Sequence, residues 1–413
     1  MAKNHIITGL DLGTKSIKVL VAGKKNGSQE LEVLEQSEIP SFGIRKGVVV
    51  NIDEVSKNIR ELLFQLQQET GRKIEEVYVN VSGSHVCCTP SHGTIVVSRA
   101  DQKISEEDIN RVVQDAQAFS LPSNREIMDV YPRQFIVDGQ EQIKEPLDMQ
   151  GMRLEVEVLA LCGFTPYLKN LTSAVLNAGL QILDINPSSL ASARACLTPQ
   201  QKELGVCLVD IGAGTTDLAV YEEGDLIHVA VFPIGSDHIT NDIAVALKTD
   251  IDIAEKIKQE FGTCIWKGGK KKEKIELPKD ASNGEPLVFS RKMLVGVIEA
   301  RVSEIFNLVQ KEIKGISRKG LLPAGVVLVG GGSKLPKMVE LAKKELKLPA
   351  RLGYPSGLVG LEKDSSWSTA AGLVLMGEDL ISENRFKKYF SFEGEIFSKL
   401  KKISKKIFKI FIP

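Results

Sequence analysis

Two short segments of the chain place an aspartate, glycines and small hydroxyl residues in the same order. Asp11-Leu12-Gly13-Thr14-Lys15 joins two apolar runs near the N-terminus, and Asp210-Ile211-Gly212-Ala213-Gly214-Thr215-Thr216 joins two more in the second half. Glycine lets the backbone approach a ligand closely, and successive backbone N–H groups in such a turn can hold a phosphate. An aspartate at the end of a strand can hold a hydrated Mg²⁺. Because the pattern occurs twice, we favour two phosphate-binding turns.

Two familiar nucleotide-binding motifs do not fit these turns. A dinucleotide-binding fingerprint needs G-x-G-x-x-G before a helix, whereas Gly212 and Gly214 are followed by Asp217 and a strand-like run. The P-loop pattern G-x-x-x-x-G-K-[ST] does not occur in the sequence. An ordinary tight hairpin, in which glycine only supplies backbone geometry, stays open as the alternative for each turn.

A third glycine-rich segment, Gly330-Gly331-Gly332-Ser333, follows the apolar run Val326–Val329 and precedes a helix expected to open near Leu335-Pro336. Three glycines between a strand and a helix let a flat ligand lie against bare backbone. Together with the two aspartate turns, this segment predicts a nucleotide site.

The elements expected around these segments form two similar series. The first has strands at 6–11, 16–22, 30–37 and 77–82, a helix at 53–69, and, after an interruption, a helix at 166–179, a strand at 181–185 and a helix at 188–197. The second has strands at 205–211, 216–222, 226–232 and 325–329, and helices from Ser236 and at 293–314, 335–346 and 367–376. Two such series predict an α/β protein with two similar sheet domains and a nucleotide in the cleft between them.

Composition places the body of the protein among ordinary soluble α/β chains. The 413 residues are 43% hydrophobic and 26% charged, which is enough for two or more domains with cores. The six cysteines lack metal-site spacing and indicate free thiols in a reducing compartment. The sequence starts without a secretory signal and has no apolar run of about 18–20 residues. We therefore expect a cytoplasmic location.

The segment 396–413 is different in character. Between Lys399 and Lys409 it holds six lysines and no acid, although the whole chain has a net charge of zero. As a helix it would separate apolar residues from lysines, which predicts a helix lying in the surface of an anionic membrane. A helix packed on the protein's own core, or one that binds a partner groove or nucleic acid, stays as the alternative. The residues expected to meet the membrane are Phe397, Leu400, Ile403, Ile407, Phe408, Phe411, Lys402 and Lys406.

The two aspartate turns and the glycine segment together resemble the actin, Hsp70 and sugar-kinase superfamily. Segments such as "SFGIRKGVVVNIDEVSKNIREL", "VYVNVSGSHV" and "PIGSDHITNDIAVALKTDIDIAEKIKQEFG" are similar to the bacterial cell-division family FtsA. The resemblance implies duplicated actin-like (RNase H-like) domains and an FtsA-type 1C subdomain. It places domain 1A at 1–83 and 162–198, 1C at 84–161, domain 2A at 199–236 and 292–377, subdomain 2B at 237–291, a linker at 378–395 and the membrane helix at 396–413.

The resemblance also implies roles for single residues, with ATP and Mg²⁺ as ligands. Asp11 and Asp210 would hold Mg²⁺ through water, and Gly235 would open a helix toward the phosphates, although Ser236 replaces an expected second glycine. Lys18 stands where many relatives have a phosphate-reaching lysine, and a solvated strand lysine is the alternative. An exposed ion pair is the alternative for Glu255 and Lys258. The residues implied to bind nucleotide are Asp11, Gly13, Thr14, Lys15, Asp210, Gly212, Gly214, Thr215, Thr216, Gly235, Glu255, Lys258, Gly331, Gly332 and Ser333.

Hydrolysis is expected to be slow, and no catalytic residue is assigned. Hydrolytic members orient the attacking water with Glu or Gln in a segment resembling 185–197, which here offers Asn186, Pro187 and serines.

The FtsA resemblance implies a scaffold at the cytoplasmic side of the cell membrane. Such a protein polymerises head to tail, with 1C in the filament contact, and its 2B subdomain binds the C-terminal peptide of FtsZ. The basic segment 266–286 suits an acidic peptide, with solvated loop lysines as the alternative. Two other functions stay open, namely a PilM-like ATPase of type IV pilus assembly and a small-molecule kinase; we expect no nucleic-acid partner.

Overall fold

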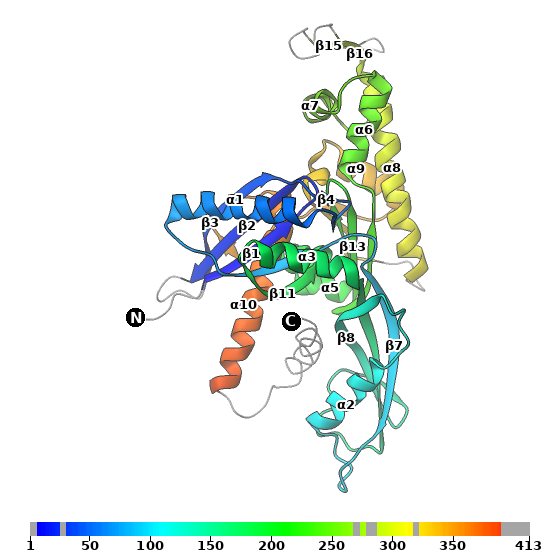
Figure 1. Cartoon of the computed structure of the whole chain (residues 1–413). Coiled ribbons are helices and arrows are strands. Elements are labelled where there is room, and N and C mark those ends of the chain that lie inside the picture. The colour runs from blue at the N-terminus through cyan, green and yellow to red at the C-terminus, as the bar shows by residue number, and fades with distance from the viewer. Residues whose placement is uncertain (1–5, 25–29, 267–272, 278–286, 317–321, 390–413) are drawn as a thin grey trace.

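The computed structural model describes residues 6–24, 30–266, 273–277, 287–316 and 322–389 (Figure 1). The amphipathic helix expected at 396–413, with every residue expected to meet the membrane, lies outside these ranges. Among the described residues, the helices are all too short or too polar to cross a membrane.

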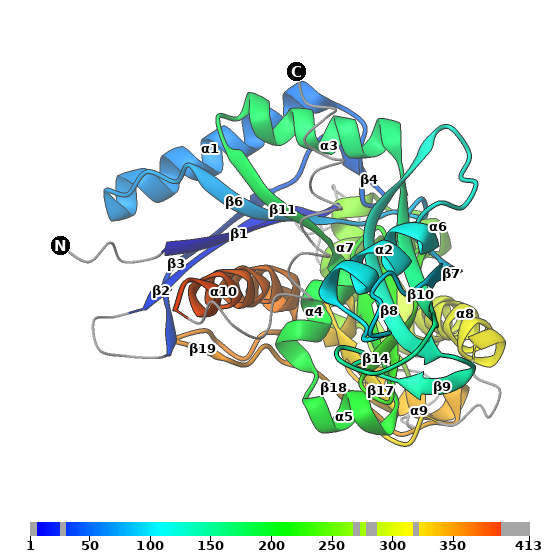
Figure 2. The same cartoon turned by 90° about the horizontal axis from the view of Figure 1, so that it is seen from below.

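The first lobe is built on a six-stranded sheet in the order β11-β6-β1-β2-β3-β19. Figure 2 shows α1 and α3 on one face of this sheet and α4 and α10 on the other. The strands are β1 (Ile6–Leu12), β2 (Ser16–Lys24), β3 (Leu31–Pro40), β6 (Glu76–Val81), β11 (Gln181–Pro187) and β19 (Leu358–Val359). The helices are α1 (Ile52–Thr70), α3 (Thr165–Asn177), α4 (Ser188–Cys196) and α10 (Ser368–Tyr389), and a small hairpin, β4 (Ile44–Arg45) with β5 (Val48–Val49), precedes α1.

The second lobe repeats this plan. Its five-stranded sheet has the order β14-β13-β12-β17-β18, which matches β3-β2-β1-β6-β11 of the first sheet strand by strand. The strands are β12 (Val206–Ile211), β13 (Thr216–Glu222), β14 (Asp225–Phe232), β17 (Val326–Val329) and β18 (Ala350–Leu352). The helices are α5 (Pro199–Leu204), α6 (Ser236–Leu247), α7 (Ile251–Phe261), α8 (Arg291–Ile316) and α9 (Met338–Leu346). The expected α/β fold with two similar sheets is therefore confirmed.

Burial explains why the central strands are so apolar. Every residue of β12 is buried, as are the seven residues from Ile17 to Gly23 within β2. A sheet covered by helices on both faces needs continuous apolar strands rather than alternating ones. The ends of β1 and β12 are the exceptions to this apolar pattern. There Asp11 and Asp210 lie beside the space between the lobes.

A separate antiparallel sheet is inserted between β6 and α3. It consists of β7 (Cys87–Val96), β8 (Arg125–Val137), β9 (Gln140–Ile143) and β10 (Arg153–Phe164), with α2 (Glu106–Ala116) against it. It has its own apolar core and extends away from both lobes (Figure 1). On the opposite side of the second lobe, β15 (Lys274–Leu277) pairs with β16 (Leu287–Ser290), while most of the basic segment between Trp266 and β16 lies outside the described residues.

Two expectations about helix limits are wrong. The helix expected from Leu335 begins at Met338, because Gly331–Lys334 forms a 3₁₀ helix (η2) and Lys337 has a left-handed φ of 67°. The closing helix continues to Tyr389, so the expected linker at 378–395 is helical over its first part. Ion pairs hold that extension on the first lobe, from Lys24 to Glu378 at 2.5 Å and from Arg194 to Asp379 at 2.7 Å.

Candidate functional site

A cavity of about 780 Å³ separates the two lobes, and both aspartate turns open into it. Eleven of the fifteen residues expected to bind nucleotide line it: Asp11, Gly13, Thr14, Lys15, Asp210, Gly212, Thr215, Glu255, Lys258, Gly331 and Gly332. The structure thus brings the two turns, the glycine segment and α7 together around one space.

The other four expected residues lie directly behind the lining. Thr216 donates its hydroxyl to the carbonyl of Ile234 at 2.8 Å, and Ser333 donates to the carbonyl of Gly330 at 2.7 Å. Gly235 lies against the second turn, where a Cβ would come within 2.5 Å of the Ala213 carbonyl oxygen. These residues, with Gly214, shape the cavity from outside its wall.

The two aspartate turns have the same internal hydrogen bond. Gly13 N–H donates to the Ser16 carbonyl at 3.1 Å, and Gly212 N–H donates to the Thr215 carbonyl at 2.9 Å. The turns also touch, because a Cβ on Gly214 would lie 2.7 Å from Thr14 Oγ1. Equivalent turns from the two lobes therefore meet at one place, as a shared phosphate site requires.

The start of α6 is held against the second turn. Ser236 N–H donates to the Gly212 carbonyl and Asp237 N–H donates to the Ala213 carbonyl, each at 2.9 Å. Ser236, which stands in place of the expected second glycine, itself lines the cavity. Its carbonyl accepts a hydrogen bond from Lys258 Nζ at 3.2 Å, so Ser236 also connects the turn region to α7.

Three aspartates crowd the floor of the cavity, namely the half-buried Asp11 and the buried Asp210 and Asp217. Burial raises the pKa of Asp11 to about 7, with Asp210 and Glu38 adding to the rise and Lys18 opposing it. Burial and the nearby Asp210 raise the pKa of Asp217 to about 7, while burial also raises the pKa of Asp210. Carboxyls in this state favour a bound cation, because a positive charge relieves the cost of ionising them.

Asn80 fixes the position of Asp11. Its amide nitrogen donates to Asp11 Oδ1 at 2.8 Å and to Ser188 Oγ at 3.0 Å. Its amide oxygen accepts from the backbone N–H of Leu12 at 2.6 Å. In the second lobe, Asp210 Oδ2 accepts from Ser192 at 2.6 Å and from Thr369 at 3.2 Å.

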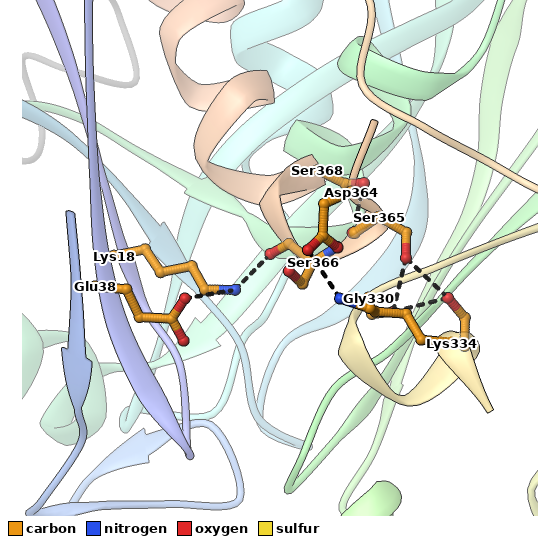
Figure 3. Close-up of polar contacts among 9 residues, drawn as sticks. Lys18, Glu38, Gly330, Lys334, Asp364, Ser365, Ser366 and Ser368 are labelled. Carbon is orange, nitrogen blue, oxygen red and sulfur yellow. Dashed lines mark hydrogen bonds and ion pairs between the residues drawn. The ribbon is translucent and has the colours of Figure 1, made fainter. Parts of the chain in front are cut away.

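Lys18 is neither solvated nor free. Its ammonium donates to the carbonyl of Ser366 at 2.7 Å and lies 3.9 Å from Glu38 (Figure 3). The ammonium also lies 5.2 Å from the ring centre of Trp367. Only 9% of the side chain is exposed. The exposed-lysine alternative is therefore wrong, and Lys18 places one positive charge in the cavity wall near the aspartates.

The glycine segment is bound to the chain that leads into α10. Gly330 N–H donates to the Ser365 carbonyl at 3.1 Å, and Ser365 Oγ donates back to the Gly330 carbonyl at 3.2 Å. Lys334 pairs with Asp364 at 2.8 Å beside them (Figure 3). Both segments line the cavity, so this side of the cavity is fixed by contacts between two distant parts of the sequence.

Glu255 and Lys258 form an ion pair of 2.6 Å, but the pair is not an exposed one. Lys258 is 5% exposed, and Glu255 also accepts from Thr240 at 2.5 Å and from Lys15 of the first turn. Burial raises the pKa of Glu255, but the bonds from Lys15, Lys258 and Thr240 outweigh it and lower the pKa to about 2. Glu255 is therefore ionised at neutral pH and forms part of the cavity wall.

The segment 185–197 brings no carboxylate to the cavity. Ser188 lines it, while the Asn186 amide nitrogen and the Ser189 hydroxyl are buried without a hydrogen-bond partner.

Sequence reasoning missed several lining residues on neighbouring elements. For Asp217 the signal was its place after the second turn, and for Asn80 and Ser82 it was the end of the expected strand at 77–82. The missed lining residues are Asp217 itself, Asn80, Ser82 and Thr369, which each hydrogen-bond an aspartate, and Ser188, which hydrogen-bonds Asn80.

The fold and the cleft first define the class of protein. Similar solved structures include the PilM–PilN type IV pilus biogenesis complex, with a TM-score of 0.65 and 17% identity over 90% of this chain and 98% of that one. Another is MreB5 of Spiroplasma citri bound to ADP, with a TM-score of 0.56 and 14% identity over 92% and 98%. At these identities the likeness concerns the fold, which is the actin-like fold.

Sequence comparisons then identify the family. Residues 207–372 match the family Cell division protein FtsA, and residues 83–162 match the SHS2 domain inserted in FtsA. The FtsA proteins of Pseudomonas aeruginosa and Bacillus subtilis are 39% and 35% identical, over 90% and 91% of this chain and 89% and 84% of theirs. FtsA of Escherichia coli is 32% identical over 91% of this chain and 90% of that protein. The chain belongs to the FtsA family of cell-division proteins.

Family membership decides between the alternatives left open by the sequence. The matches to FtsA proteins reach 39% identity, whereas the pilus protein is 17% identical. The FtsA resemblance is thus confirmed, and the match to the pilus protein is the weaker of the two.

Proposed function

We propose that this chain binds ATP with Mg²⁺ in the cleft between its lobes and attaches FtsZ filaments to the cytoplasmic face of the membrane at the division septum. The observation that supports nucleotide binding most directly is the contact of the two aspartate turns at Thr14 and Gly214. A triphosphate bound there would receive backbone N–H groups from both lobes. The similar fold of MreB5, solved with ADP, supports the same ligand class.

Magnesium fits this site as a hydrated ion. The described residues contain no group of three or more side chains placed to hold a metal directly. Asp11, Asp210 and Asp217 instead bring carboxyl oxygen atoms to the cavity wall, which suits a cation that keeps several waters and binds phosphate oxygens. Bound magnesium would neutralise phosphate charge, while the chain's own part is to hold Asp11 through Asn80 and Asp210 through Ser192.

Hydrolysis in this site should be slow. The segment 185–197 contains no Glu or Gln and brings only Ser188 to the cavity, so the attacking water would lack the orienting residue that hydrolytic members use. Phosphate release by the purified protein tests this proposal. Turnover well above about one per second, a typical lower value for enzymes, would contradict it.

The membrane assignment rests on the amphipathic pattern of 396–413. Its six lysines and its apolar residues favour a helix lying in an anionic bilayer surface. Co-sedimentation with vesicles of anionic lipid tests it, with the chain ending at Glu395 as the comparison. We expect binding to be lost on truncation and to weaken with salt, since about 1 kcal/mol per lysine comes from charge. Binding that survives truncation would contradict the assignment.

Family membership supports filament formation and FtsZ binding. We assign the filament contact to the inserted subdomain at 84–161 and the FtsZ peptide to the subdomain at 237–291. Electron microscopy on lipid monolayers with ATP tests the first assignment, and fluorescence anisotropy of a labelled FtsZ C-terminal peptide tests the second. Full peptide affinity after removal of the β15–β16 hairpin would shift the peptide site to another part of 237–291.

A further inference from the structure

Lys15 and Glu255 are both among the residues implied to bind nucleotide, yet they bind each other. Lys15 Nζ donates to Glu255 Oε1 across the cleft. Lys15 belongs to the first aspartate turn, between β1 and β2 of the first lobe, and Glu255 belongs to α7 of the second lobe. The ion pair therefore joins the two lobes on the wall of the proposed nucleotide cavity.

The pair lies at the outer side of the cleft. The Lys15 side chain is 51% exposed and that of Glu255 is 20% exposed. At the floor of the cleft the lobes are joined by a buried contact instead. There Ser82 of the first lobe donates a hydrogen bond to Asp217 of the second, and both residues are buried. The cleft is thus closed at its floor by buried hydrogen bonds and at its solvent side by an ion pair.

The two partners differ in how firmly they are held. Glu255 is fixed by Thr240 at 2.5 Å, by Lys258 at 2.6 Å and by Gln259 at 2.8 Å, all from the second lobe. The ammonium of Lys15 lies at the end of a long, half-exposed side chain. Glu255 is its one ion-pair partner among the described residues. Such a lysine can swing away from a fixed carboxylate at low cost, as expected of a half-exposed ion pair.

We propose that Lys15 and Glu255 form a clasp that must open each time a nucleotide enters or leaves the cleft. This inference rests on the proposed ATP site. With phosphates at the two turns and the base beside Gly331 and Gly332, the pair would cross the solvent side of the bound nucleotide. The clasp would then set the exchange rate more than the affinity, because opening it precedes both association and release.

Stopped-flow fluorescence of mant-ATP with Mg²⁺ on the full chain tests the clasp, with Lys15→Met, Glu255→Gln and the double variant. A half-exposed ion pair is worth up to about 1 kcal/mol, which corresponds to about a fivefold change in rate. We expect each single variant to raise both the association and the release rate about fivefold. The double variant should match either single one, since both substitutions break the same contact.

Two controls separate the clasp from simple loss of charge. Lys46→Met removes a lysine from the β4–β5 hairpin beside Gly214, and Asp252→Asn removes an exposed acid from α7 itself. Neither touches the pair, so both rates should stay within about twofold of wild type.

The outcomes distinguish the clasp from the function on which it rests. If release alone becomes faster, or if the effects of the two substitutions multiply, Lys15 and Glu255 are separate ligand contacts and the clasp is wrong. If the wild-type chain shows no saturable mant-ATP binding, the proposed nucleotide site fails and the clasp fails with it. Saturable mant-ATP binding with wild-type rates in all three variants would contradict the clasp and leave the proposed nucleotide site standing.

Discussion

Ser82 Oγ donates a hydrogen bond of 2.7 Å to Asp217 Oδ1, so a side chain of the first lobe is bound to a carboxyl of the second. Ser82 follows β6, and Asp217 is the second residue of β13. The Ser82 hydroxyl also lies 3.2 Å from Thr215 Oγ1 of the second aspartate turn. This buried contact fixes the two lobes, and with them the two turns, at the floor of the cleft.

Ser82→Ala should therefore destabilise the chain. The substitution leaves the buried Asp217 without one of its donors, at a cost of about 1–3 kcal/mol in the free energy of unfolding. Urea denaturation measures it. Ser41→Ala is the matched control, because the buried Ser41 hydroxyl has no hydrogen-bond partner and its removal should cost under about 0.5 kcal/mol. Equal losses for both variants would show that the contact between the lobes does not stabilise the fold.

The stability of the nucleotide-free chain should fall between about pH 4 and pH 7. Burial first, and neighbouring carboxylates second, raise the pKa of Asp11 and of Asp217 from 3.8 to about 7 in the folded chain. The folded state then binds more protons than the unfolded state, so the contribution is complete below about pH 4 and is lost as pH rises through about 7.

Asp217→Asn should make this pH dependence shallower and raise the free energy of unfolding at pH 8 by about 1–3 kcal/mol without Mg²⁺ or nucleotide. Thermal unfolding across the pH range measures it, with the exposed Asp252→Asn as the control. A variant with the wild-type pH profile would show that Asp217 does not titrate as described.

Lys18→Met should weaken ATP·Mg²⁺ binding about tenfold, which corresponds to about 1.4 kcal/mol for one charge-assisted contact. The substitution removes the ammonium nearest to Asp11 and Asp210 and its bond to the Ser366 carbonyl. Lys24→Met is the control, because Lys24 also forms an ion pair, with Glu378, and does not line the cavity between the lobes. Unchanged affinity in the Lys18 variant would remove this lysine from the phosphate site.

Gly214→Ala should push the two turns apart. The added Cβ would meet Thr14 Oγ1 at 2.7 Å, Thr14 Cγ2 at 2.8 Å and Lys46 Cα at 3.1 Å. We expect a loss of about 1–3 kcal/mol in the free energy of unfolding and weaker nucleotide binding. Gly296→Ala in α8 should instead stabilise the chain by about 0.5–1 kcal/mol, because nothing lies within 4 Å of its added Cβ. If both substitutions stabilise the chain, the turns are not in contact.

The sequence predicted the fold because the pattern that matters is local. Each aspartate turn joins two neighbouring strands, so its hairpin follows from glycine and apolar runs within about twenty residues, and the repeat of this pattern implied the second sheet. The limits of α9 and α10 depend instead on the backbone conformation of a single residue and on contacts with distant parts of the chain. Lys337 adopts a left-handed conformation, and the part of α10 beyond Met376 forms ion pairs with Lys24 and Arg194.

The partners of the expected site residues could not be predicted from the sequence. Asn80 reaches Asp11, and Ser82 reaches Asp217, only after the chain has formed both sheets and brought β6 beside the second lobe. The same holds for Lys15 and Glu255, which are 240 residues apart and meet only through the arrangement of the lobes. Local patterns identified the turns, and tertiary packing decided what they touch.

The most direct measurement is isothermal titration calorimetry of the full chain with ATP and Mg²⁺, repeated with Asp210→Ala. The wild-type chain should bind one nucleotide per chain, and the variant should bind at least about tenfold more weakly, since a carboxylate from the second turn is lost. No saturable binding by the wild-type chain, or full-affinity binding by the variant, would contradict a nucleotide site between the two turns.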